Sequence, residues 1–366
     1  MTARPSSILF VHSSDERYGA DRMLLELLDA VPEATAAEVW LPTDLEHPPA
    51  PLCELLDERG CVVRHVDLPV LRRAYRRPRE LARLLARAAR FGRLVRERRP
   101  DAVYFTTSAT FLAAPVARLA GVRGVYGHLQ EIWTAGDRRI LAPLARSCGR
   151  LIAISAAVAD STGPRLRERI RVVPNGSPAP EGGSPLGAHD GPLRFVVASR
   201  WNGWKGHRTL LAAWDRLESD ARLTVLGGPP PSGDAVDVPE LVRRLRRPET
   251  VAVVGEVTDA SSYLEEADVV LVPSDAPEPF GLVAIEAFAR GRPVIASAGG
   301  GLLDIVTDGR DGWLFPARDV ERLAGLIDGL DRPRAVAAGT CAGETYRRRF
   351  TSAAFAARWR AATGFD

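Results

Sequence analysis

The stretch that decides the fold lies at residues 269–288 and reads VVLVPSDAPEPFGLVAIEAF. Its first four residues are a β-branched, apolar run of the kind that forms a buried strand. Pro277 and Pro279 hold the following loop extended, and Gly281 opens an apolar helix. Because strand, loop and helix in this order form the repeating unit of an open α/β sheet, we predict an α/β fold.

The same alternation of short apolar runs and longer helical patterns extends outward in both directions. Helical patterns lie between the runs, for example at residues 20–28 and 79–96. Parallel strands need right-handed crossovers, so the alternation predicts parallel, Rossmann-like sheets. The expected strands are residues 8–11, 38–41, 62–66, 102–105, 124–126, 151–154, 171–173, 193–198, 223–226, 251–254, 269–272, 293–296 and 312–315.

A segment rich in proline, glycine and serine at residues 174–185 interrupts the alternation and is typical of a linker. We therefore expect a Rossmann-like N-terminal domain at 1–176, a linker at 177–192 and a Rossmann-like C-terminal domain at 193–345. A last helical pattern, at 346–361, is expected to pack back on the N-terminal domain as part of residues 346–366. A cleft between two facing domains is the default ligand site.

The composition is that of a globular protein with balanced charge. Hydrophobic residues make up 46% and charged residues 26% of the 366 residues, and the net charge is +3. This balance calls for no polyanionic partner, and nucleic-acid binding is not expected. The four cysteines form no C-x-x-C and show no metal-like clustering with histidine, which predicts reduced thiols in a cytoplasmic protein. No apolar run reaches a membrane-spanning length.

Lys205 is the only lysine among 49 basic residues. It lies in a glycine-punctuated loop that follows the expected strand at 193–198, with Arg200 at the end of that strand. A compact ammonium suits a phosphate oxygen, and the carboxyl ends of parallel strands are where open α/β sheets bind ligands. Lys205 and Arg200 are thus candidates for binding an anion. Taken alone, an accidental surface lysine is an equal explanation.

Two glutamates flank the start of the helix that Gly281 opens. The unpaired amides and partial positive charge of a helix start suit a pyrophosphate. Glu278 lies in the loop before the helix, and Glu286 lies more than one turn inside it on an apolar face. A buried carboxylate needs partners, and ribose hydroxyls would serve. The alternative is that Glu286 reaches solvent or caps a neighbouring loop.

Together these motifs resemble, over nearly the whole chain, the retaining glycosyltransferases of family four, which have the GT-B fold. Glu278 and Glu286 match the family's E-x7-E motif, and Arg200 with Lys205 and Gly206 matches its GR…KG loop. Three further matches are weaker one by one but fall in the family's order: the loop at 17–21 containing Gly19, the NG turn at 173–176 and the glycine loop at 297–301.

The resemblance implies a role for each matching residue. Arg200 and Lys205 would bind the donor diphosphate and Glu286 the donor ribose, while Glu278 would contact sugar hydroxyls near the anomeric carbon. The backbone at Val257 would receive the base, and His128 would touch the donor sugar. The remaining substrate-binding candidates come from the matching loops and are Gly19, Phe280, Gly281 and Leu282.

Several of these assignments have alternatives or depart from the family pattern. His128 has a structural alternative as an imidazole that caps a helix, and Glu131 is a weaker candidate for the same site. The loop at 17–21 has one glycine, Gly19, where relatives often have two. Asp304 stands where relatives commonly have glutamate, so its contact with the sugar is in doubt.

Neither a metal nor a cofactor is expected. No D-x-D is present, since Asp234 and Asp237 are separated by two residues. Arg200, Lys205 and the helix start at Gly281 would neutralise the diphosphate instead. The absence of G-x-x-x-x-G-K-[S/T] argues against a nucleoside triphosphatase.

A basic segment runs from Arg64 to Arg99. It has three interpretations: a solvated helix face in an arginine-biased chain, which we favour slightly, peripheral attachment to anionic lipid at the inner face of the membrane, and binding of an anionic acceptor.

The resulting prediction is a cytoplasmic, retaining, metal-independent glycosyltransferase. Its donor would be a nucleotide-diphosphate sugar, with UDP- and GDP-sugars first, bound by the C-terminal domain. The N-terminal domain would take a hydroxyl acceptor on a glycan, lipid or natural product. The alternatives are a nucleotide-sugar epimerase of the same fold and a catalytically silent sugar or nucleotide binder.

Overall fold

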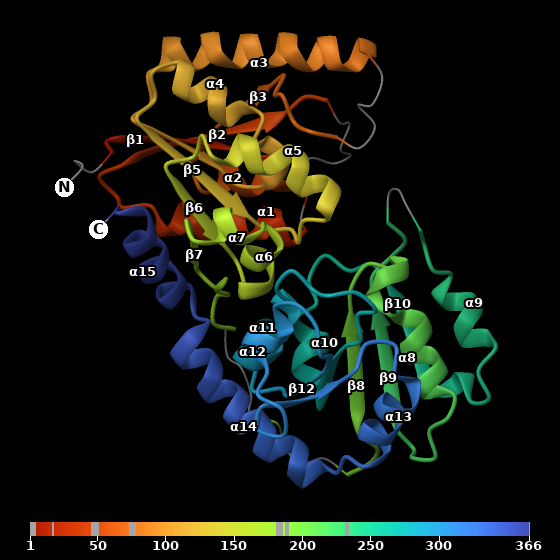
Figure 1. The fold of residues 1–366 in the computed structure, drawn as a ribbon. Helices are drawn as coiled ribbons and strands as arrows, with labels where there is room; N and C mark the ends of the chain where they lie inside the picture. The colour runs from red at the N-terminus through yellow and green to blue at the C-terminus, as the bar shows by residue number, and fades with distance from the viewer. Residues whose placement is uncertain are drawn as a thin grey trace. The chain divides into compact units, whose positions relative to one another are not determined.

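The computed structural model describes residues 5–16, 18–44, 51–72, 78–180, 186, 190–230 and 234–365. The chain divides into two compact units (Figure 1). Unit 1 comprises Met1–Asn175 and Ser352–Asp366, and unit 2 comprises Gly176–Thr351. The predicted linker thus belongs to unit 2, whose boundary falls one residue before the predicted end of the first domain.

Unit 1 is built on a parallel sheet of seven strands in the order β3-β2-β1-β4-β5-β6-β7. Its strands are β1 (Ser7–Val11), β2 (Ala36–Pro42), β3 (Val62–Val66), β4 (Ala102–Phe105), β5 (Gly124–Leu129), β6 (Arg150–Ala153) and β7 (Ile170–Val172). Its helices are α1 (Gly19–Ala30), α2 (Pro51–Glu58), α3 (Pro78–Arg98), α4 (Ala113–Leu119), α5 (Ala135–Ala145), α6 (Ala156–Ser161), α7 (Pro164–Arg167) and α15 (Ser352–Thr363). The central strands β1 and β4 are almost wholly buried, as their apolar runs predict.

Unit 2 is built on a parallel sheet of six strands in the order β10-β9-β8-β11-β12-β13. Its strands are β8 (Arg194–Ala198), β9 (Arg222–Leu226), β10 (Val251–Gly255), β11 (Val269–Val272), β12 (Val294–Ser297) and β13 (Gly312–Phe315). Its helices are α8 (His207–Trp214), α9 (Val238–Arg243), α10 (Ser261–Glu266), α11 (Leu282–Ala289), α12 (Leu302–Ile305), α13 (Val320–Asp328) and α14 (Arg332–Arg349). The prediction of parallel, Rossmann-like sheets is therefore confirmed in both units.

The predicted single helix at 346–361 is wrong, because the chain breaks between α14 and α15. Phe350 is fully buried, with its ring 6.2 Å from that of Phe280, and its carbonyl accepts a hydrogen bond from the amide of Ser177 at 2.9 Å. The backbone of Phe350, with a φ of −125°, also leaves the helical region, and α14 ends here.

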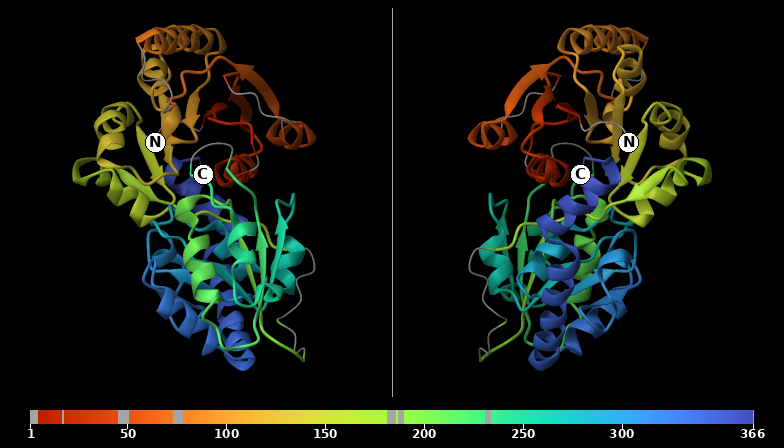
Figure 2. Two further views of the ribbon diagram at one scale, coloured as in Figure 1. Left: turned by 90° about the vertical axis from the view of Figure 1, so that its right-hand side faces the viewer. Right: turned by 90° about the vertical axis from the view of Figure 1, so that its left-hand side faces the viewer.

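The last helix, α15, packs against α1 within unit 1, although the two helices are at opposite ends of the sequence (Figures 1 and 2). Trp359 donates its indole N–H to the hydroxyl of Tyr104 at 2.9 Å, and Arg360 donates to the carbonyl of Ala30 at 2.8 Å. Trp359 is completely buried, so it is part of the core of unit 1.

Candidate functional site

The candidate site in unit 2 lies where the strand order reverses. β8 pairs on one side with β9, the next strand in sequence, and on the other with β11. Loops that leave the carboxyl ends of β8 and β11 therefore diverge to opposite sides, which is where open α/β sheets bind ligands. Lys205 belongs to the first loop and Glu278 to the second.

Lys205 and Glu278 meet across this reversal point. The ammonium Nζ of Lys205 lies 2.8 Å from Oε1 of Glu278, and the same oxygen accepts a hydrogen bond from Ser274. The ammonium also lies 4.3 Å from the ring centroid of Trp204. The Glu278 side chain is 6% exposed and that of Lys205 22% exposed, so the pair is set into the surface while its cation remains accessible.

The two loops are joined by backbone and side-chain contacts. The amide of Asp275 donates to the carbonyl of Trp204 at 2.8 Å, and Thr209 donates to the carboxylate of Asp275 at 2.7 Å. Gly206 has a φ of 75°, and a Cβ there would lie 1.8 Å from the carbonyl oxygen of Pro273. Only glycine permits this approach, so Gly206 fixes the position of Lys205 relative to Glu278.

The glycine loop after β12 supports Glu278 from the other side. The amide of Gly301 donates to the carbonyl of Glu278 at 2.8 Å. Gly300 has a φ of 66°, and a Cβ there would come within 2.0 Å of the same carbonyl oxygen. The predicted glycine loop therefore acts on the position of Glu278. Asp304 lies on α12, which follows this loop, and is partly exposed.

The start of α11 is formed by Gly281, whose φ of 114° is open to glycine alone, and Leu282 is the first helical residue. Phe280 is 3% exposed and packs on Phe350, so its side chain belongs to the core. Glu286 is 7% exposed and lies inside α11. The structure thus places Glu286 on the same helix that begins beside Glu278.

The loop containing Arg200 is linked to the loops after β9 and β10. The amide of Trp201 donates to the carbonyl of Gly228 at 2.8 Å, and the amide of Gly227 donates to the carbonyl of Gly255 at 2.7 Å. Arg200 and Val257, both half-buried, therefore belong to the same edge of the sheet.

His207, the first residue of α8, is buried beside this site. Burial, and secondly the charge of Lys205, lower the pKa of His207 to about 4. The imidazole is therefore neutral at physiological pH and adds no charge beside Lys205.

In unit 1, His128 lies in the interior. It is 0% exposed, and its Nδ1 lies 3.1 Å from the hydroxyl of Tyr104, which also accepts from Trp359. Burial lowers the pKa of His128 to about 3. Its Nε2 has no hydrogen-bond partner among the residues that the structure describes. The Tyr104 contact holds the ring from the Nδ1 side, and the contact of His128 with a donor sugar stays a prediction.

Glu131 and Gly19 lie at the carboxyl edge of the sheet of unit 1. Glu131 accepts from the amides of Ser108 and Gln130, both at 3.3 Å, and burial raises its pKa. Gly19 is the first residue of α1, and Arg17 of the same loop lies outside the described residues.

Sequence reasoning missed a polar cluster that fixes the loop before Gly19. Asp21 accepts from Ser14 at 2.7 Å, from the amide of Tyr18 at 3.0 Å and from His12, whose Nε2 lies 3.0 Å away. Burial opposes ionisation of Asp21, but these bonds hold its pKa below the usual value. The sequence signal that could have predicted this cluster is the position of His12 and Thr106, each directly after one of two adjacent strands. His12 Nδ1 lies 2.6 Å from the Thr106 hydroxyl.

The expectation that no cysteine clusters with histidine is wrong. Cys53 Sγ lies 3.2 Å from Nε2 of His65 and 3.2 Å from Oδ2 of Asp15. The three residues are distant in sequence, and the parallel pairing of β1, β2 and β3 brings their segments together.

The basic segment is largely ion-paired where the structure describes it. Arg72 and Arg87 both contact Asp44, at 2.9 Å and 3.4 Å, and Arg64 contacts Glu38 at 2.8 Å. Exposed apolar side chains also lie on α3, namely Leu81 at 55% and Leu85 at 60% exposure. The arginines at 73, 76 and 77 lie outside the described residues.

Two protein families match the two halves of the chain. The family described as Glycosyltransferase Family 4 matches residues 18–178, and that described as Glycosyl transferases group 1 matches residues 192–330. Among the described helices, we find none long and apolar enough to cross a bilayer.

Curated relatives match parts of the chain. The D-inositol 3-phosphate glycosyltransferase of Mycobacterium marinum is 42% identical over 122 residues, which are 32% of this chain and 26% of the relative. The glycogen synthase of Mycobacterium tuberculosis is 34% identical over 220 residues, which are 57% of this chain and 51% of the relative. The matches thus span about a quarter to a half of the length of these relatives.

Solved structures share the fold over nearly the whole chain. Anabaena Alr3699/HepE in complex with UDP has a TM-score of 0.81 at 22% identity and covers 98% of this chain and 99% of its own. Sucrose-phosphate synthase from Thermosynechococcus elongatus has a TM-score of 0.74 at 21% identity and covers 97% of both chains. At such identities the likeness shows the fold alone, and the predicted GT-B fold class is confirmed.

Proposed function

We propose that this chain, whose two halves match Glycosyltransferase Family 4 and Glycosyl transferases group 1, moves a sugar from a nucleotide-diphosphate sugar to a hydroxyl acceptor. The observation that carries the proposal is the Lys205–Glu278 pair at the strand-order reversal of unit 2. A cation and a carboxylate held together at that edge offer one group to a diphosphate and the other to sugar hydroxyls.

The donor diphosphate would bind the ammonium of Lys205, the guanidinium of Arg200 and the amides at the start of α11. Glu278 would then exchange part of its contact with Lys205 for hydroxyls of the donor sugar. Glu286, one helix turn further on, would accept hydrogen bonds from the ribose, and the backbone at Val257 would hold the base. This arrangement needs no metal ion, because the cations of the chain neutralise the diphosphate.

The reaction that we propose proceeds with retention of configuration. The bond between the anomeric carbon and the phosphate oxygen breaks with its electron pair going to the phosphate, and the sugar carbon becomes cationic. The acceptor hydroxyl attacks from the same face, a new carbon–oxygen bond forms, and the hydroxyl proton passes to the leaving phosphate. Lys205 and Arg200 stabilise the charge that grows on that phosphate, so they act most strongly in the transition state.

A UDP-sugar is the first donor to test, since the structural neighbour Alr3699/HepE was solved with UDP and with UDP-glucose. GDP-sugars come next. For the acceptor we propose a hydroxyl on a glycan, a lipid or a natural product, taken by unit 1.

The test is a thermal-shift panel of UDP-, GDP-, dTDP- and ADP-sugars, followed by nucleotide release measured with and without acceptors. We expect one nucleotide to raise the melting temperature and its release to depend on the acceptor. The shift should be lost in Lys205→Ala and retained in Arg216→Ala, an exposed ion-paired residue of the same unit. If no nucleotide stabilises the protein, or if the sugar is epimerised without release, the proposal fails.

A further inference from the structure

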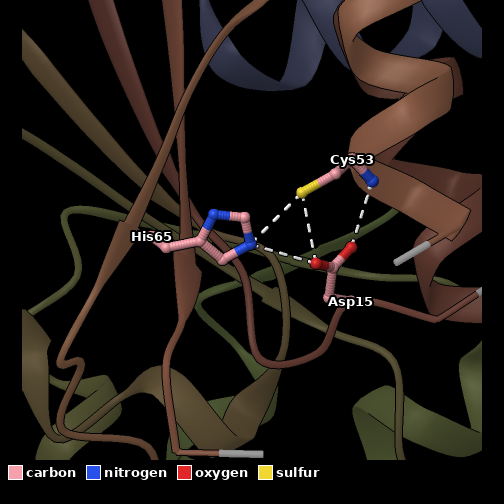
Figure 3. Close-up of side chains that lie close together, drawn as sticks. All are labelled: Asp15, Cys53 and His65. Carbon is pink, nitrogen blue, oxygen red and sulfur yellow. Dashed lines mark hydrogen bonds and ion pairs between the residues drawn. The ribbon is translucent and has the colours of Figure 1, made fainter. Parts of the chain in front are cut away.

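A second polar cluster lies in unit 1, apart from the residues used above. It joins the loop after β1, which carries Asp15, to the first turn of α2, which carries Cys53, and to the edge strand β3, which carries His65. Figure 3 shows the imidazole, thiol and carboxylate converging, with Nε2, Sγ and Oδ2 directed at one another. The three atoms are separated by 3.1 Å to 3.2 Å.

The convergence is unlike that of a catalytic thiol relay. In such a relay the carboxylate orients one imidazole nitrogen while the other faces the nucleophile. Here Cys53 and Asp15 both contact the same nitrogen, Nε2 of His65. The geometry therefore provides three ligand atoms around one point and no path for moving a proton between the two sides of the ring.

Hydrogen bonds alone do not satisfy this triangle. Three pairwise contacts at hydrogen-bonding distance need three protons, whereas the thiol and Nε2 of the imidazole supply at most two when the carboxylate is ionised. The carboxylate is well held, since its other oxygen, Oδ1, accepts from the amide of Cys53 at 3.1 Å. A cation at the centre would take the place of the missing protons and satisfy all three ligands at once.

We propose that Asp15, Cys53 and His65 form a Zn²⁺ site of unit 1. One sulfur, one imidazole nitrogen and one carboxylate oxygen are the ligand types that zinc takes in proteins, and softer or harder divalent ions suit this mixed set less well. Tetrahedral zinc separates such ligands by roughly 3.4–3.6 Å, so the side chains need to open by only about 0.3–0.4 Å. Three protein ligands leave one coordination position for water or an exogenous anion.

The ion has a route to the site. The Asp15 side chain is 5% exposed, but that of His65 is 48% exposed. Zinc would thus enter beside β3 and tie this edge strand to the loop after β1 at the carboxyl edge of the sheet.

The experiment uses the full chain, stripped of metal and titrated with Zn²⁺ against a chromophoric chelator. We expect one ion per chain, with an affinity at least tenfold lower in Cys53→Ser and in His65→Ala. Cys61→Ser is the matched control, because Cys61 is a partly exposed cysteine three residues after α2 and belongs to no such group of ligands among the residues that the structure describes. Co²⁺ should give a thiolate charge-transfer band that Cys53→Ser abolishes. Unchanged Zn²⁺ binding in Cys53→Ser would overturn the proposal.

A second measurement guards against misfolded variants. In the unaltered protein, Zn²⁺ should slow alkylation of Cys53 by a maleimide at least tenfold and leave Cys61 unaffected, as read by peptide mass spectrometry. Equal alkylation of Cys53 with and without Zn²⁺ would contradict the proposal. Neither measurement depends on sugar transfer, so the zinc site and the proposed function stand or fall separately.

Discussion

Removing the ammonium of Lys205 should affect stability and turnover by different amounts. In Lys205→Ala, the Glu278 carboxylate, 6% exposed, would keep the Ser274 hydroxyl as its one side-chain partner among the described residues. Breaking a fully buried pair costs about 3–5 kcal/mol, but the 22% exposure of Lys205 admits solvent and screens the loss. We therefore expect the free energy of unfolding of unit 2 to fall by about 1–2 kcal/mol, which corresponds to a drop in Tm of roughly 2–8 °C.

In Lys205→Ala, turnover should be affected more strongly than stability. Loss of one preorganised cation that acts on the leaving phosphate lowers kcat by roughly a hundredfold or more, or about 2.7 kcal/mol of activation free energy. Lys205→Arg restores the charge but replaces a compact head group with a wider planar fork, in a loop whose backbone is held close to its neighbours at Gly206 and Gly203. A Cβ at Gly206 would lie 1.8 Å from Pro273, and one at Gly203 would lie 2.2 Å from Asp234. The arginine variant should regain only part of the activity.

The assay combines nucleotide release with calorimetric titration of UDP and a double-mutant cycle. Lys205→Met and Glu278→Gln together should cost less stability than the sum of the two single changes, because the double variant leaves no buried charge unpaired. Arg216→Ala, which removes an exposed ion pair, should stay within about 0.5 kcal/mol of the unaltered protein. Full activity in Lys205→Arg would refute the reasoning, since the lone lysine would then be an accident of composition.

Four further predictions follow from the same structure. Glu286→Ala should weaken UDP binding itself, whereas Glu278→Ala should lower turnover more than UDP affinity; equal losses of affinity, measured by calorimetry, would contradict this division. The Kd for UDP should be the same in EDTA and in Mg²⁺, and a strict requirement for the ion would exclude metal-independent donor binding. If the segment from Arg64 to Arg99 meets a membrane, binding of the protein to anionic vesicles should fall with salt and weaken in Leu85→Ser, whereas sedimentation without preference for anionic lipid would support the solvated face that we favour. Finally, the folded pKa values of His128 and His207, about 3 and about 4, lie below the unfolded value, so the unfolded chain binds more protons as the pH falls. The free energy of unfolding should therefore decrease below about pH 6.5, by up to about 1.4 kcal/mol per pH unit for each histidine. An unchanged midpoint of unfolding in urea between pH 7 and pH 5 would disprove this prediction.

The sequence by itself determined the elements and the composition of the donor site. Each strand is a short run of β-branched and apolar residues that cannot satisfy a helical period, so β3, β4, β11 and β13 begin and end where the pattern predicts. Lys205 and Glu278 were identifiable because each lies in the loop that follows a strand. Residues at the carboxyl ends of parallel strands share one edge of a sheet whatever the rest of the chain does.

The tertiary structure decided which of those residues touch. Lys205 and Glu278 are 73 positions apart, and only the adjacency of β8 and β11 closes that distance to 2.8 Å. His128 satisfies the same strand-end rule as Lys205, yet it is buried because Tyr104, itself bonded to Trp359 from the far end of the chain, lies against it.

The break at Phe350 and the cluster around Asp15 could not be predicted from local sequence patterns either. The helical period continues through Phe350, and the break falls where the core of unit 2 takes its ring and Ser177 donates to its carbonyl. Asp15, Cys53 and His65 have no recognisable spacing, since three separate segments supply one ligand each. Local pattern is a property of neighbours along the chain, whereas a site is made by strand order and packing, which act between residues that the chain separates.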